Sequence, residues 1–138
     1  MRVMALDIGD RRIGVALSDP TQTLSSPLST IDRAHDKDPV KSIVSLADEH
    51  GTDKILVGLP ITLAGELGTQ ARTVLEFVEQ LKAETNIGIS TVDERYSTIE
   101  ARRRIRESSV TRSRRERGDV DAAAAAVMLQ SYLDTGNL

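Results

Sequence analysis

Apolar and polar positions follow two periods along the chain, and the first part has the pattern of β-strands. Residues 2–8 and 12–18 are two apolar runs around the charged turn GDRR, in which Gly9 supplies backbone freedom. A third, short strand is predicted near 28–31, after a loop that contains proline and serine. The N-terminal third therefore predicts an antiparallel meander.

Further along the chain, apolar positions recur at helical spacing between short apolar runs. Asp38-Pro39 is typical of a helix N-cap followed by the first helical position, and Gly51 is predicted to end this helix. The runs DKILVGLP and IGISTV predict two more strands, and a second helix with an apolar stripe lies between them.

Two further helices are predicted near the C-terminus. Ser97 and Glu100 have the spacing of a capping box that opens one, and the last begins near Asp119 and contains five consecutive alanines. The order of elements predicts an α/β fold: a mixed five-stranded sheet, first an antiparallel meander and then parallel strands, with helices on both faces. Residues 1–138 are predicted to form a single domain.

Composition narrows the chemistry that this fold can carry. The 138 residues include no cysteine, which excludes disulfides and thiolate metal sites, and the two histidines are isolated in the sequence. A bound metal would therefore have carboxylate ligands, which favours magnesium or manganese. No apolar run approaches the roughly 20 residues of a membrane span, and the N-terminal residues lack the pattern of a signal peptide. We expect a cytoplasmic protein.

The charge is distributed unevenly. The net charge is −3, but residues 102–117 contain eight arginines and two glutamates, a local charge of +6. Such a segment can be a solvated face or a flexible loop, and residues 108–118 are predicted to form a mobile loop. Alternatively, the segment is a surface that binds phosphates, because the fork of the arginine guanidinium matches phosphate oxygens.

Acidic residues fall at comparable places in several predicted elements. Asp7 lies near the end of the first strand, Asp93 and Glu94 end the last strand, and Asp121 lies in the first turn of the last helix. Each alone has a structural explanation, as a turn acceptor, a solvated strand end or a helix N-terminal acid. Together at one edge of a sheet they would repel one another, so their convergence indicates a divalent cation.

The sequence resembles the bacterial pre-16S rRNA nuclease family, also described as Holliday-junction-resolvase-like, of the ribonuclease H-like superfamily. The resemblance rests on four blocks in order along nearly the whole chain: LDIGDRRIGVALSD, ILVGLP, VDERYSTIEA and DVDAAAAAVMLQSYL. It implies a ribonuclease H-like fold and a nuclease that hydrolyses phosphodiester bonds with two Mg²⁺ or Mn²⁺ ions. The implied catalytic and metal-binding residues are Asp7, Glu94 and Asp121, with Asp93 as an additional metal ligand.

The resemblance also implies a nucleic-acid substrate. The family name points to maturation of the 5′ end of the 16S rRNA precursor, on ribosomal precursor particles, and the older name to branched DNA, whose symmetric cleavage requires a homodimer. The chain departs from the family at ITLAG, where relatives have Asn and Asp after GLP, and at Asp10, where a small hydroxyl residue is common. The arginines expected to bind nucleic acid are Arg11, Arg12, Arg95, Arg102, Arg103, Arg106, Arg112, Arg114, Arg115 and Arg117.

Two other classes of function remain open from the sequence. An ATP-binding protein of the sugar-kinase and actin type shares a related strand core, but it closes on its nucleotide between two domains, and 138 residues supply one. A non-catalytic RNA-binding assembly or transcription factor would not need Asp7, Glu94 and Asp121, which are all present. The nuclease is therefore the leading hypothesis.

Overall fold

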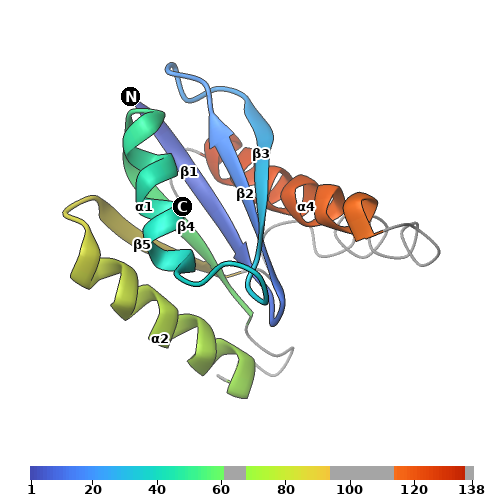
Figure 1. Cartoon of the computed structure of the whole chain (residues 1–138). Helices are drawn as coiled ribbons and strands as arrows, with labels where there is room; N and C mark the ends of the chain where they lie inside the picture. Colours follow the sequence, from blue (N-terminus) through green and yellow to red (C-terminus); the bar gives the residue numbers. More distant parts are fainter. Residues whose placement is uncertain (61–67, 94–113, 136–138) are drawn as a thin grey trace.

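The computed structural model describes residues 1–60, 68–93 and 114–135, with side chains in the last range from Asp121 onward. Five strands and three helices lie in these ranges (Figure 1). The strands are β1 (Arg2–Ile8), β2 (Arg12–Ser18), β3 (Ser25–Asp32), β4 (Thr52–Leu59) and β5 (Gly88–Asp93). The helices are α1 (Pro39–Glu49), α2 (Thr69–Glu84) and α4 (Arg114–Asp134).

The strands form one mixed sheet in the order β3-β2-β1-β4-β5. β1 pairs antiparallel with β2, and β2 with β3, whereas β1 with β4 and β4 with β5 are parallel. The predicted meander followed by parallel strands is confirmed. β1 lies at the centre of the sheet, so its side chains are covered on both faces, which explains its nearly continuous apolar sequence.

Helices α1 and α2 cover one face of the sheet (Figure 1). The side chain of Asp38 accepts a hydrogen bond from the N–H of Lys41 at 3.2 Å, which confirms the predicted N-cap of α1. The apolar stripe of α2, which includes Val74 and Phe77, packs with Met4 and Leu6 of β1. These contacts build the larger part of the core.

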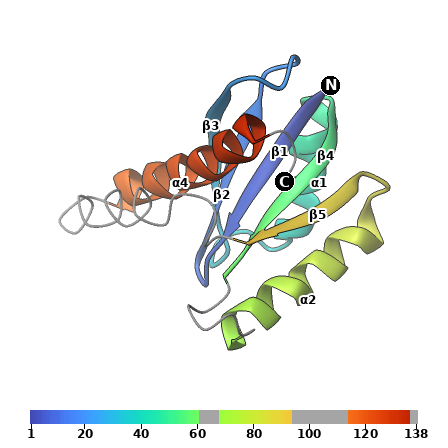
Figure 2. The same ribbon diagram turned by 180° about the vertical axis from the view of Figure 1, so that it is seen from behind.

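Helix α4 covers the opposite face and runs along β1, β2 and β3 (Figure 2). Its buried alanines and Leu129 pack with Val3, Ala5 and Leu56 of the sheet. Small side chains let the helix backbone lie close to the strands. Ser25 of β3 ties the helix down, because its hydroxyl donates to the carbonyl of Ala126 at 2.6 Å.

Two predicted boundaries are wrong. β3 begins at Ser25 rather than near residue 28, because pairing with Ser18 extends the hairpin and compensates for the weak strand propensity of serine and proline. α4 begins at Arg114, so 114–118 is helical instead of loop, since arginine and glutamate favour helix and Gly118 does not interrupt it. The helix predicted from Ser97 lies outside the described residues.

Among the described helices, none is long and apolar enough to cross a membrane.

Candidate functional site

Asp7 is a buried carboxylate in the central strand. It has only 6% of its surface exposed, although it lies in a strand whose other buried residues are apolar. Strand alternation places it on the face of Val3 and Ala5, which is the face that α4 covers. Burying a charged group is costly unless other groups compensate for it, so this position indicates a specific role.

Gly14 brings α4 directly to Asp7. The two residues are paired across β1 and β2, so they are neighbours on one face of the sheet. A Cβ atom built on Gly14 would lie 2.1 Å from the backbone oxygen of Asp121, closer than any real contact. The absence of a side chain at position 14 therefore lets the start of the alanine segment of α4 lie against β2, beside Asp7.

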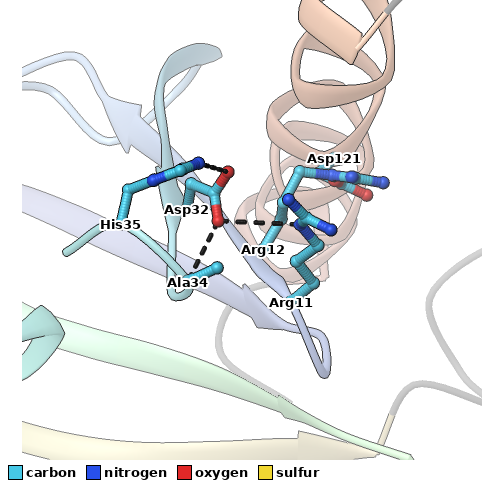
Figure 3. A network of polar contacts seen from close by, with 6 residues as sticks. All are labelled: Arg11, Arg12, Asp32, Ala34, His35 and Asp121. Carbon is cyan, nitrogen blue, oxygen red and sulfur yellow. Dashed lines mark hydrogen bonds and ion pairs between the residues drawn. The ribbon is translucent and has the colours of Figure 1, made fainter.

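Asp121 is held by an ion pair with Arg12 of β2. Nε of Arg12 donates to Oδ2 of Asp121 at 2.7 Å, and the two side chains are 25% and 21% exposed (Figure 3). A charge-assisted bond of this length in a half-buried place is stronger than one on the open surface. The structure therefore gives Arg12, which the sequence assigns to nucleic-acid binding, an acidic partner within the chain.

Asp93 points away from this group. It is the last residue of β5 and pairs with Leu59, whose side chain packs with the α1 and α2 core. Val92, the preceding residue, packs with the α4 side instead. By alternation, the Asp93 side chain belongs to the α1 and α2 side and Asp7 to the other face. Glu94, the predicted third carboxylate, lies outside the described residues.

The structure describes few of the predicted nucleic-acid-binding arginines. Arg11 lies in the turn between β1 and β2, has 56% of its side chain exposed, and approaches Asp32 at 3.8 Å (Figure 3). Arg114, Arg115 and Arg117 lie in the first turns of α4, whose side chains are not described. The remaining five, Arg95, Arg102, Arg103, Arg106 and Arg112, fall outside the described residues.

The donor set fits a hard divalent cation only in part. Asp7 and Asp121 supply carboxylate oxygens on one face of the sheet, the ligand type that Mg²⁺ and Mn²⁺ prefer. Within the described ranges, no three His, Cys, Asp or Glu residues are grouped so that they could hold a metal ion. A complete site would need a further ligand from outside these ranges, and the resemblance to the nuclease family implies Glu94 for that role.

Sequence reasoning did not identify Gly14 or Arg33 as important for this site. An isolated glycine inside a strand is a known signal of close backbone approach, so Gly14 could have been found. Arg33 directly follows β3, and its guanidinium donates to the carbonyl of Gly9 at 2.8 Å. No sequence pattern links residues 24 positions apart in this way, and only the fold brings them together.

The chain is similar to the members of one family over nearly its whole length. A family model described as "RuvX: Holliday junction resolvase" matches residues 1–135. A protein of Roseiflexus sp. strain RS-1 described as "Putative pre-16S rRNA nuclease" is 43% identical over 134 residues, 97% of this chain and 94% of that protein. A protein of Desulforamulus reducens with the same description is 40% identical over 136 residues, 99% of this chain and 98% of that protein.

Solved structures share the fold at low sequence identity. RuvC of T. thermophilus, in complex with a Holliday junction substrate, superposes with a TM-score of 0.58 at 13% identity and covers 99% of this chain and 96% of its own. The fowlpox virus Holliday junction resolvase gives a TM-score of 0.55 at 13% identity, with 98% and 99% coverage. At such identity the likeness concerns the fold alone: the chain shares the fold of these resolvases, and the predicted mixed five-stranded sheet with helices on both faces is confirmed.

Proposed function

Since this chain belongs to the family described as RuvX, Holliday junction resolvase, we propose that it is a divalent-metal-dependent endonuclease that processes the 16S rRNA precursor. The observation that carries the proposal is the placement of Asp7. A carboxylate 6% exposed in the central strand lies beside Gly14, against which the backbone of Asp121 packs. Asp7 and Asp121, which are separated by 114 positions in the sequence, thus share one face of the sheet.

Asp7, Asp121 and Glu94 are the residues that would hold the metal, and Asp93 is not favoured because it belongs to the other face. When bound, Mg²⁺ or Mn²⁺ supplies activation of water and stabilisation of the leaving oxygen in phosphodiester hydrolysis. The rigid strand fixes the Asp7 carboxylate, and a group held in this way avoids reorganisation during the reaction. The Asp121 carboxylate is bonded to Arg12, so its Oδ2 would have to exchange that bond for one to the metal.

Arg11 and the arginines of 102–117 would contact backbone phosphates without reading sequence. The exposed guanidinium of Arg11 lies in the turn that directly follows the Asp7 strand, so it is suited to a phosphate near the cleaved bond. The descriptions of the relatives at 43% and 40% identity favour precursor rRNA as substrate.

A second candidate is cleavage of branched DNA. It is favoured by the description of the family model and by the fold shared with resolvases. Symmetric cleavage of a junction would require two copies of the chain.

The test uses wild type and the variant Asp7→Asn with two substrates: a 16S rRNA precursor fragment and a synthetic four-way DNA junction. Each reaction is run in Mg²⁺, in Mn²⁺ and in EDTA. We expect cleavage of the RNA by wild type in the presence of metal and no cleavage by Asp7→Asn, because the amide lacks the charge that binds a cation. Preferred cleavage of the junction would instead favour the second candidate.

The matched control is Asp10→Asn, which removes an exposed carboxylate three residues further along the same hairpin. It should retain cleavage if the effect is specific to the buried position. Equal cleavage by wild type and Asp7→Asn, or cleavage in EDTA, would contradict the proposal. A folded wild type that cleaves neither substrate would favour a non-catalytic RNA-binding role.

A further inference from the structure

The turn between β1 and β2 is held by Arg33, a residue outside the hairpin. Its guanidinium donates to the carbonyl of Gly9 at 2.8 Å, and its backbone N–H donates to the carbonyl of Arg11 at 2.7 Å. The turn closes on itself through a bond from the N–H of Gly9 to the carbonyl of Arg12 at 2.9 Å. These three hydrogen bonds thus fix the segment that joins Asp7 to Arg12.

The guanidinium of Arg33 is itself supported from the core. It lies over the ring of Phe77, 5.4 Å from its centroid, and Phe77 is a 4%-exposed residue of α2. A guanidinium over an aromatic face is a favourable arrangement, because the face of the ring carries negative potential. The side chain of Arg33 therefore connects α2 to the turn between β1 and β2.

Asp32 fixes the backbone from which Arg33 extends. Its carboxylate accepts from the N–H of Ala34 at 2.9 Å and lies 3.8 Å from both Arg11 and His35 (Figure 3). Its carbonyl accepts from the N–H of His35 at 3.1 Å. The segment after β3 is therefore a folded turn that presents Arg33 toward Gly9.

We propose that Arg33 is a positioning residue for the candidate active site. By holding the carbonyl of Gly9, it fixes the β1–β2 turn, and with it the alignment of Asp7 on β1 with Arg12 on β2. Arg33 acts through the backbone and does not touch the substrate. This inference rests on the proposed nuclease function.

The test compares Arg33→Met, Arg33→Lys and a control, Arg2→Met. Arg2 makes the same kind of contact at the other end of β1, since its guanidinium donates to the carbonyl of His50 at 3.2 Å. The first measurement is amide hydrogen exchange at Gly9, which needs no substrate. We expect Arg33→Met to speed exchange there by about tenfold, because the turn opens more often, Arg33→Lys to give an intermediate rate, and Arg2→Met to change nothing.

The second measurement is steady-state cleavage of the RNA fragment in Mg²⁺. Arg33→Met should lower kcat by about tenfold and leave KM within about threefold of wild type, because misplacement of a catalytic group affects the transition state more than substrate binding. Arg33→Lys should restore part of kcat, and Arg2→Met should retain it.

The outcomes separate the two proposals. Unchanged exchange at Gly9 in Arg33→Met would overturn the positioning role, and so would a raised KM at constant kcat, which would instead mean that Arg33 binds the nucleic acid. A wild type that cleaves no substrate would overturn the nuclease proposal. In that case faster exchange at Gly9 would still support the hold of Arg33 on the turn, and unchanged exchange would refute it.

Discussion

Gly14 is the residue on which the approach of α4 to the sheet depends. In Gly14→Ala the new Cβ would lie 2.1 Å from the backbone oxygen and 2.4 Å from the backbone carbon of Asp121, so the helix must shift. We expect the free energy of unfolding to fall by about 2–3 kcal/mol, as for other overpacked cores. Cleavage should fall as well, because the shift separates Asp121 from Asp7. Denaturant unfolding measures the first effect.

The control for this prediction is Gly88→Ala in β5, where a Cβ would meet no atom within 4 Å. Its stability should stay within about 1 kcal/mol of wild type, since the loss of chain entropy in the unfolded state offsets other effects. Equal destabilisation by the two substitutions would mean that strand propensity, and not the contact with α4, governs position 14.

Arg12 provides a second prediction at the residue scale. Its guanidinium and a bound cation would compete for Oδ2 of Asp121, which now lies 2.7 Å from Nε of Arg12. We therefore expect Arg12→Met to bind Mn²⁺ about three- to tenfold more tightly than wild type, because removing a neighbouring positive charge favours the cation. Isothermal titration calorimetry on metal-free protein measures this affinity.

Arg11→Met is the matched control, because it removes an adjacent but exposed arginine that does not contact Asp121 in the described contacts. Its Mn²⁺ affinity should equal that of wild type. Weaker Mn²⁺ binding by Arg12→Met would show that Arg12 orients Asp121 for the metal and does not compete with it.

Single residues were predicted from sequence only where their type conflicts with their surroundings. Asp7 could be identified because a carboxylate in an apolar strand is conspicuous, and its burial agrees with that interpretation. The pairing of Arg12 with Asp121 and the contact of Arg33 with Gly9 join residues 109 and 24 positions apart. Sequence spacing carries no information on such contacts, because the packing of α4 and of the β3 end creates them.

At the scale of elements, the β2–β3 hairpin provides a pH-dependent prediction. Asp19 accepts from the N–H groups of Leu24 at 2.9 Å and Thr23 at 2.8 Å, and from the hydroxyl of Thr21. The bond from Leu24, followed by those from Thr21 and Thr23, holds the pKa of Asp19 well below its usual range. The charged form thus stabilises the folded hairpin.

Because the folded pKa is lowered, this stabilisation is present above the unfolded pKa of about 3.9 and is lost as the pH falls toward the folded value. Asp19→Asn should therefore unfold at a lower temperature than wild type at pH 7, and the difference should shrink below about pH 4. Thermal unfolding from pH 7 to pH 2.5 measures it. Asp53→Asn, at an exposed position in β4, is the control, and an equal pH trend in both variants would contradict the role of Asp19.

The elements themselves were predicted well where local signals are strong. β1, β2 and α1 lie where alternation, the GDRR turn and the Asp38-Pro39 cap place them. Their stabilising contacts are mostly local. Glycine was predicted at position 9 for its backbone freedom, but the φ of Gly9 is not positive. Glycine is needed there because a Cβ would lie 2.9 Å from the carbonyl oxygen of Arg12. The start of β3 was misplaced because cross-strand pairing, a long-range effect, decides it. The start of α4 was misplaced because the helix propensity of its arginines and glutamate outweighs the effect of Gly118.

At the scale of the whole molecule, the distribution of charge separates two regions. Residues 102–117 carry a net charge of +6 in a chain of net charge −3, so the remainder is acidic. An acidic body repels nucleic acid, so the basic segment, together with Arg11 in the β1–β2 turn, would bind the phosphates and bring them toward the face that carries Asp7 and α4. Arg114 and Arg115 belong to this segment and are also the first residues of α4, the helix that covers that face.

The double variant Arg114→Gln and Arg115→Gln tests this arrangement. Loss of two phosphate contacts should make the slope of log affinity against log salt shallower by about 1.5, with kcat at saturating RNA nearly unchanged. Fluorescence anisotropy across a series of KCl concentrations measures the slope. The control removes two positive charges from the helices of the other face, Lys41→Gln and Lys82→Gln, and should leave the slope unchanged. If both pairs weaken binding equally, net charge alone attracts the nucleic acid; an effect confined to the arginine pair locates the phosphates beside α4.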